Sequence, residues 1–136
     1  METQSTLQQL LLILSALTNE PAPVEPPTIL IVPAYAMPCT CEAAYDQRKL
    51  YLRNDINWTD PRWLSIVLHE LEHHRQFLRR GSAHDCVDWM DRERQALLLQ
   101  TEYLEKARSG YRPAMSLACR EEERYRRAPQ DDLSTN

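Results

Sequence analysis

The chain has 136 residues and a net charge of −4, and 43% of its residues are hydrophobic while 26% are charged. This length and balance predict one soluble globular domain with a modest core. The mild acidity, without a basic stripe interleaved with aromatics, argues against a nucleic-acid partner. No run of about 18 or more apolar residues occurs, so we expect no membrane-spanning helix.

The N-terminal segment is rich in leucine. Residues 10–17 resemble the hydrophobic region of a signal peptide, but Glu2 and no lysine or arginine precede them, where a basic region is expected. The leucines from Leu7 onward repeat at helical spacing. We therefore expect an amphipathic first helix and a cytoplasmic protein. A secreted or periplasmic protein, with residues 1–18 removed, is the alternative.

Proline and glycine divide the chain into a turn-rich first half and a helical second half, because most prolines precede Pro61 and only 2 glycines occur. The first half is expected to hold a helix at 6–18, a proline-rich connector at 21–27, a buried strand at 28–32, a loop at 34–41, and short strands at 43–45 and 49–52. The second half is expected to hold helices at 61–80, from 85–88 to about 107 and at 113–127, then a frayed tail. Thr59 or Asp60 would cap the second helix and Gly81 would end it. We expect one domain over 1–127 with a disordered tail at 128–136.

A His-Glu-x-x-His motif lies in the expected 61–80 helix. His69 and His73 are four residues apart, so they share one helical face and can converge on a single zinc ion. Glu70 lies about 100° around the helix from His69, where it can reach a water on that metal and act as general base. The alternative is an amphipathic helix whose histidines have no common role.

Two further residues of this helix have separate interpretations. His74 falls in the middle of the apolar arc, which favours a packed core histidine whose ring satisfies a backbone group. Glu72 falls on the opposite side, which favours a solvated surface charge. Neither residue is expected to bind the metal.

A carboxylate supplies the third candidate ligand. Glu93 lies near the centre of the apolar stripe of the next helix, where an unpaired charge is costly. It follows His73 by twenty residues, enough for an antiparallel helix to return past the motif. His69, His73 and Glu93 would form a zinc site with an open fourth position. The alternative is that Glu93 pairs with an arginine such as Arg62.

Other polar groups leave more than one interpretation open. Gln100, on the Glu93 face, could hold a ligand histidine or Gln76, or it could belong to a buried polar network. Cys39 and Cys41 are too close for a zinc knuckle and have no second knuckle. Loop thiols or one or two disulfides are expected, with Cys86–Cys119 as one possible pair.

These motifs resemble the gluzincin branch of the zincin-like metallopeptidases, in its small single-domain bacterial form. The resemblance rests on His69-Glu70-x-x-His73, with a glutamine at Gln76, and on the later Glu93-Arg-Gln-Ala segment preceded by Cys86. It implies an α+β fold in which a sheet of two or three strands packs on the motif helix and the glutamate helix. It also implies one Zn²⁺ ion held by the two histidines and Glu93.

The resemblance further implies a zinc hydrolase that cleaves a peptide or protein, with Glu70 polarising the water that attacks the carbonyl. The 49–52 segment would be the edge strand to which a peptide adds. Tyr111, His84 and Tyr103 are candidates to stabilise the oxyanion, and their spacing selects none of them. The alternative function is a weakly active or inactive zincin-like module that binds a peptide or protein partner. The sequence leaves the substrate and the oligomeric state open.

Overall fold

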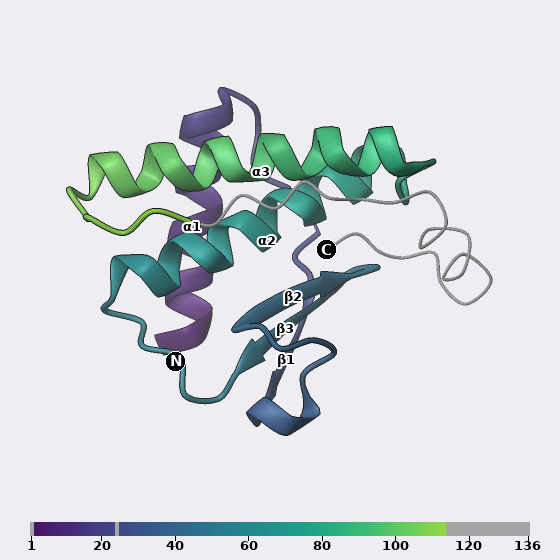
Figure 1. Ribbon diagram of the computed structural model, residues 1–136. Coiled ribbons are helices and arrows are strands. Elements are labelled where there is room, and N and C mark those ends of the chain that lie inside the picture. Colours follow the sequence, from purple (N-terminus) through teal and green to yellow (C-terminus); the bar gives the residue numbers. More distant parts are fainter. Residues whose placement is uncertain (1, 24, 114–136) are drawn as a thin grey trace.

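The computed structural model describes residues 2–23 and 25–113, which form three helices and a small sheet (Figure 1). In chain order the elements are α1 (Glu2–Thr18), β1 (Thr28–Val32), the 3₁₀ turn η1 (Ala34–Ala36), β2 (Ala43–Asp46), β3 (Lys49–Arg53), α2 (Pro61–Arg80) and α3 (Cys86–Lys106). The α+β class is therefore confirmed. The helix and tail expected after Pro113, and Cys119, lie outside the described residues.

The boundaries of the second and third helices follow from their capping residues. Asp60 precedes Pro61, and its side chain accepts a hydrogen bond from the Arg62 N–H at 2.9 Å. Gly81 ends α2 with a φ of 73°, a left-handed conformation that glycine adopts without strain. Asp85 caps α3 in the same way as Asp60 caps α2. These predicted boundaries are confirmed.

The sheet is mixed and has the strand order β1-β3-β2. β2 and β3 form an antiparallel hairpin whose two turn residues, Gln47 and Arg48, have φ values of 46° and 75°. β1 pairs with the other side of β3 in parallel. The expectation that 49–52 is an edge strand is wrong, because β3 is paired on both sides. The edges are β1 and β2.

The strand β1 was expected to be buried, and this expectation is also wrong. None of its residues is fully buried, and Ile31 is largely exposed. A continuous β-branched run is typical of a buried strand, but the same run also suits an edge strand. The hydrophobic pattern does not show whether a strand will be paired on one side or on both. Proline residues flank this edge at Pro27 and Pro33, which limits further pairing.

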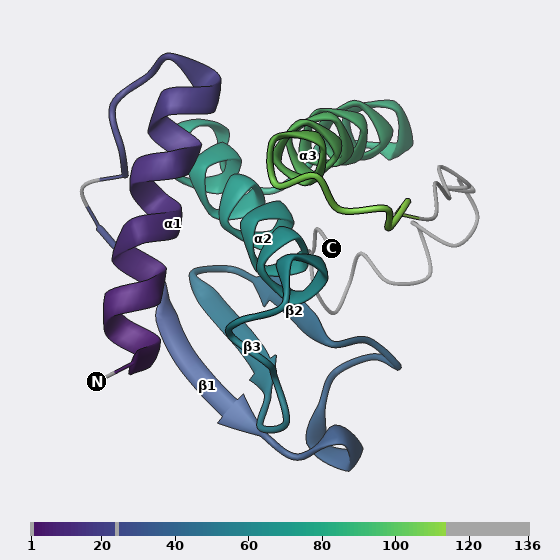
Figure 2. The same ribbon diagram turned by 90° about the vertical axis from the view of Figure 1, so that its left-hand side faces the viewer.

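The motif helix α2 lies between the sheet and α3, and α1 packs along it from a third direction (Figures 1 and 2). The core is formed by apolar side chains of α1, the hairpin and α2, including Leu10, Leu14, Leu50, Leu68 and Leu71. Because α2 has neighbours on several sides, its polar residues are buried as well as its apolar ones. None of the described helices is long and apolar enough to cross a membrane.

Three of the described cysteines form disulfides, one pair in a loop and one cysteine at a buried position of α3. Cys39 and Cys41 are bonded to each other in the exposed loop before β2, with Cα atoms 5.2 Å apart. Cys86, at the start of α3, is also disulfide-bonded. The expectation of disulfides is confirmed, while the suggested partner of Cys86 lies outside the described residues.

Candidate metal centre

The structure brings His69, His73 and Glu93 together between α2 and α3. The Glu93 carboxylate reaches both imidazoles, with Oε1 at 2.9 Å from His73 Nε2 and Oε2 at 3.3 Å from His69 Nε2. One ligand atom from each residue lies within 4.8 Å of the others, so the group could hold a metal ion. We call these residues the His–His–Glu group. Arg62 pairs with Glu42 and not with Glu93.

Two glutamines orient the histidines of this group. His69 Nδ1 lies 2.9 Å from Gln100 Oε1, and His73 Nδ1 lies 2.9 Å from Gln76 Oε1. An amide oxygen only accepts hydrogen bonds, so each Nδ1 carries the proton. In the neutral rings the lone pair is then on Nε2, which faces Glu93. Such support of the far nitrogen is typical of histidines that bind metals.

The charges of the His–His–Glu group favour a cation at its centre. Burial by itself would raise the pKa of Glu93, but hydrogen bonds from His69 and His73 hold that pKa well below its usual range. Burial would lower the pKa of His73, yet the hydrogen bond that its imidazole donates to Glu93, together with the charges of Glu70 and Glu93, raises it to about 9. Positive charge between Glu93 and the imidazoles is therefore favourable, and a proton or a metal ion can supply it.

Glu70 is buried beside this group, with an exposed fraction of 8%. Burial raises the pKa of its carboxyl, while the charges of His69 and His73 and a backbone hydrogen bond from Tyr45 of β2 lower it. Its Oε1 has no hydrogen-bond partner among the described residues. Because an unpaired buried carboxylate oxygen is costly, this atom is suited to receive a water or a substrate group.

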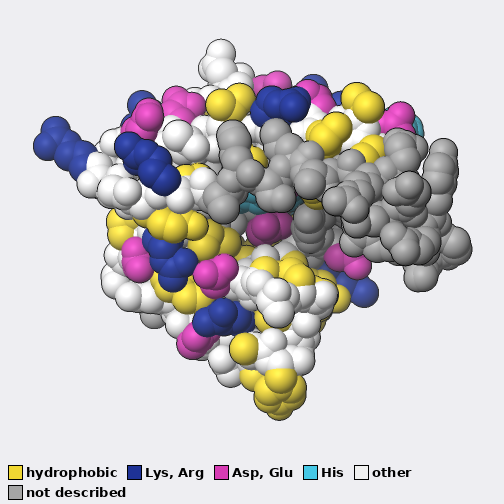
Figure 3. All heavy atoms as spheres, viewed as in Figure 1, with side chains coloured by type: hydrophobic (Ala, Val, Ile, Leu, Met, Phe, Trp, Pro, Cys, Tyr) yellow, Lys and Arg dark blue, Asp and Glu magenta, His cyan; other side chains and the backbone are white. Residues whose placement is uncertain are grey.

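The imidazoles of this group are buried. In Figure 3, acidic and histidine side-chain atoms are visible between the helices and the sheet. His69 is 7% exposed while His73 is 2% exposed, so the group is close to solvent without projecting into it.

His74 has the structural role expected from the sequence. It is fully buried, with Nδ1 at 2.7 Å from the Tyr45 hydroxyl and Nε2 at 2.7 Å from the Glu25 carbonyl oxygen. Burial lowers the pKa of this imidazole, which keeps the ring neutral. Both ring nitrogens are occupied by protein groups, so His74 joins β2 and the proline-rich connector to α2.

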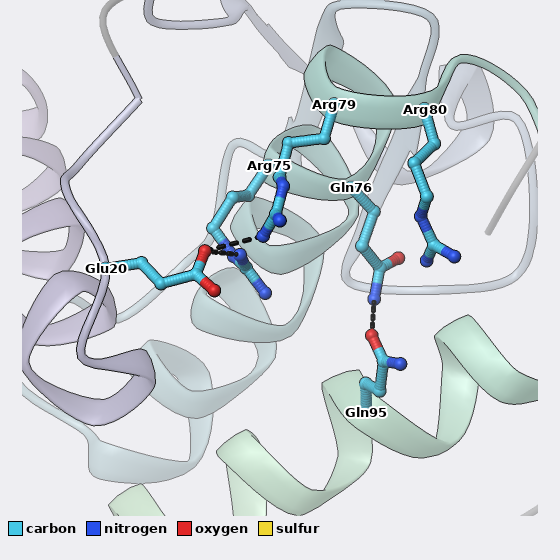
Figure 4. Close-up of a pocket in the computed structure, with 6 residues that line it drawn as sticks. All are labelled: Glu20, Arg75, Gln76, Arg79, Arg80 and Gln95. Carbon is cyan, nitrogen blue, oxygen red and sulfur yellow. Dashed lines mark hydrogen bonds and ion pairs between the residues drawn. The ribbon is translucent and has the colours of Figure 1, made fainter.

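The expectation that Glu72 is a surface charge is wrong, because its side chain is fully buried. Both carboxylate oxygens accept hydrogen bonds from the Arg75 guanidinium at 2.7 Å, and Gln76 Nε2 donates to Oε2 at 3.2 Å. Arg75 also bonds to Glu20, beyond the end of α1 (Figure 4). The spacing of three residues between Glu72 and Arg75 predicts that they pair. The burial of Glu72 is explained only by the packing of α1 against α2, in addition to the sheet and α3.

None of the three candidates for oxyanion stabilisation hydrogen-bonds to the His–His–Glu group or to Glu70 within the described residues. Tyr103 packs against the hydrophobic core. The Tyr111 ring lies 5.7 Å from Arg62 Cζ. His84 lies in the loop between α2 and α3, where its N–H donates to Asp88.

Comparisons of the chain with protein-family models, with curated proteins and with solved structures found no match. The chemistry of the site is therefore inferred from the side chains that form it and from their surroundings.

Proposed function

We propose that the protein is a zinc-dependent hydrolase in which His69, His73 and Glu93 bind one Zn²⁺ ion. The observation that carries the proposal is the convergence of two Nε2 atoms on one carboxylate, with both Nδ1 atoms held by glutamines. Two imidazoles and a carboxylate are a donor set of catalytic zinc sites, in which a fourth position stays open. The unpaired Oε1 of Glu70 also fits such a site.

The proposed reaction is hydrolysis of a peptide bond. A bound zinc ion would supply a Lewis acid that polarises the carbonyl and lowers the pKa of the attacking water. Glu70 would accept the proton of that water on its unpaired oxygen and pass it to the leaving amine. The burial that raises the pKa of Glu70 makes it a stronger base for this transfer. Gln76 and Gln100 would fix the tautomer and the orientation of the two imidazoles.

The outer edge of β2 is where we expect the peptide to lie. Ala43, Ala44 and Tyr45 are at most 4% exposed, so peptide binding must uncover this edge. Arg53 N–H donates to the Glu42 carbonyl, and in an antiparallel pair only alternate residues exchange hydrogen bonds. The backbone N–H and C=O groups of Ala43 and Tyr45 therefore point away from β3, toward the free edge. The backbone hydrogen bond from Tyr45 to Glu70 agrees with this direction. A peptide added beside Ala43 would extend the sheet past Glu70.

Metal content tests the zinc site. We expect about one equivalent of zinc in the purified protein by mass spectrometry, and Glu93→Ala should weaken zinc affinity by more than about a hundredfold, beyond the loss of an outer partner. Glu102→Gln, on the exposed side of α3, is the matched control and should bind zinc like the wild type. A wild type that binds no zinc at micromolar concentration would contradict the proposal.

Turnover tests the hydrolase. In a peptide library, Glu70→Gln should lose cleavage while it retains zinc, because the amide has the shape of the carboxylate but is not a base. Cleavage by Glu70→Gln at the wild-type rate would show that another group is the base. Glu102→Gln again serves as the control.

A second candidate function is a zinc-bound module that binds a peptide without cleaving it. The observation that favours it is that, among the described residues, Tyr103, Tyr111 and His84 make no hydrogen bond to the site and have partners elsewhere. One equivalent of zinc, with peptide capture and no turnover by the wild type, would favour this function over the hydrolase.

A further inference from the structure

A polar pocket of about 380 Å³ lies on the Gln76 side of His73 (Figure 4). It is lined by three arginines and a glutamine of α2, a glutamine of α3 and a glutamate after α1: Arg75, Arg79, Arg80, Gln76, Gln95 and Glu20. His73 Nδ1 bonds to Gln76, so this pocket and the His–His–Glu group share that glutamine. The pocket has no role in the proposed hydrolysis.

The charges around this pocket do not balance. Among residues 2–23 and 25–113, four guanidiniums are in contact with three carboxylates, which leaves one positive charge in excess (Arg75, Arg79, Arg80 and Arg92 with Glu20, Glu72 and Asp88). The remaining charge is best assigned to Arg80, because its only carboxylate contact within the described residues is at 3.8 Å. That carboxylate, Asp88, already bonds to Arg92 at 3.2 Å. A monoanion would neutralise the pocket.

The Glu20 carboxylate indicates what kind of group these arginines bind. Its Oε1 accepts hydrogen bonds from Arg75 at 2.5 Å and from Arg79 at 2.6 Å. The Glu20 side chain is 41% exposed, so water can compete with these bonds. Guanidinium groups in this arrangement match the oxygens of carboxylates and phosphates.

The amide groups of the pocket can rearrange. Gln76 Nε2 lies within hydrogen-bond distance of three acceptors, Glu72 Oε2, the Arg92 carbonyl and Gln95 Oε1, but it carries only two hydrogens. Gln95 can therefore turn toward a ligand without leaving Gln76 unsatisfied. Any shift of the Gln76 side chain would change its hydrogen bond with His73 Nδ1, because Gln76 is only 2% exposed and has little room to move.

We propose that this pocket binds a small oxyanion, a phosphate or carboxylate group, between Arg79 and Arg80, and that Gln76 transmits its binding to His73. Anion binding to this pocket does not depend on the proposed function. Only an effect of the anion on zinc affinity, through Gln76 and His73, would rest on that function. Glu20 competes with the anion for Arg79, so it limits the affinity of the pocket.

The test is a titration of the full-length, metal-free protein with inorganic phosphate, followed by nuclear magnetic resonance. A parallel titration with acetate distinguishes a phosphate site from a carboxylate site, and sodium chloride at equal ionic strength controls for screening. We expect saturable shifts of the Gln76 and Gln95 side-chain amides and of the His73 ring nitrogens. The absence of saturation with both anions would overturn the proposal.

Paired variants give opposite predicted signs. Arg80→Ala should weaken anion binding by about tenfold, the loss of roughly one charge-assisted hydrogen bond. Glu20→Gln should tighten binding, because the competing carboxylate is removed. The controls carry the same charge changes on exposed positions of α3, Arg94→Ala and Glu102→Gln, and should leave binding unchanged. Equal effects of Arg80→Ala and Arg94→Ala would show a general response to charge and overturn the site.

Discussion

Three histidines of α2 lie within five residues of one another, yet they have two different surroundings. His69 and His73 each have one nitrogen held by a glutamine and the other facing Glu93. His74 has both nitrogens held by neutral protein groups. The same type of side chain is therefore arranged to bind a cation at positions 69 and 73, and to join parts of the fold at position 74. The partner of the second nitrogen decides between these roles.

The largest expected effect separates the two kinds of histidine. His73→Ala should reduce zinc affinity by more than about a hundredfold, because it removes a ligand and not only an outer partner. His74→Ala should still bind one equivalent, because neither of its nitrogens faces Glu93. Competition with a chelator of known affinity measures both variants. Equal losses in the two variants would remove the distinction.

The next effect concerns stability. His74→Phe should lower the free energy of unfolding of the metal-free protein by about 2 kcal/mol, because the Glu25 carbonyl and the Tyr45 hydroxyl lose a buried partner. Urea denaturation measures this change. Tyr45→Phe in the same background tests the coupling, and the double variant should cost less than the sum of the single ones. Additive losses would mean that the two side chains act separately.

The smallest effect concerns the glutamines. Gln100→Leu should weaken zinc affinity by about tenfold, because His69 loses the group that fixes its tautomer. Gln100→Glu should restore the affinity, since a carboxylate also accepts from Nδ1. The same chelator competition measures both variants. Failure of Gln100→Glu to recover affinity would indicate that Gln100 acts through packing or Ser65 instead.

Much of the secondary structure could be predicted because its signals are local. The cap at Asp60, the stop at Gly81 and the hairpin around Gln47 each depend on a few neighbouring residues. The approach of Glu93 to the two histidines could be predicted as well. A charge in an apolar stripe needs a partner, and the chain length allowed an antiparallel return.

Other features depend on which elements become neighbours. The edge strand next to the motif helix is β2 and not the predicted segment, because β1 crosses over to pair with the far side of β3. Glu72 is buried because α2 is covered from several directions, whereas a helical wheel assumes one covered face. The pairing of His69 with Gln100 likewise required the relative position of α2 and α3, whereas His73 and Gln76 are three residues apart on α2 itself.

The sequence by itself determined the helix that presents His69 and His73, the carboxylate that joins them and the structural place of His74. Helical periodicity and the cost of a buried charge act over a few residues, so both can be read from the order of the chain. The tertiary structure alone decided that Gln100 bonds to His69, which strand edge lies beside the motif helix, and the arginine pocket beside Gln76. These depend on contacts between segments far apart in the chain, which arise only when the layers pack together.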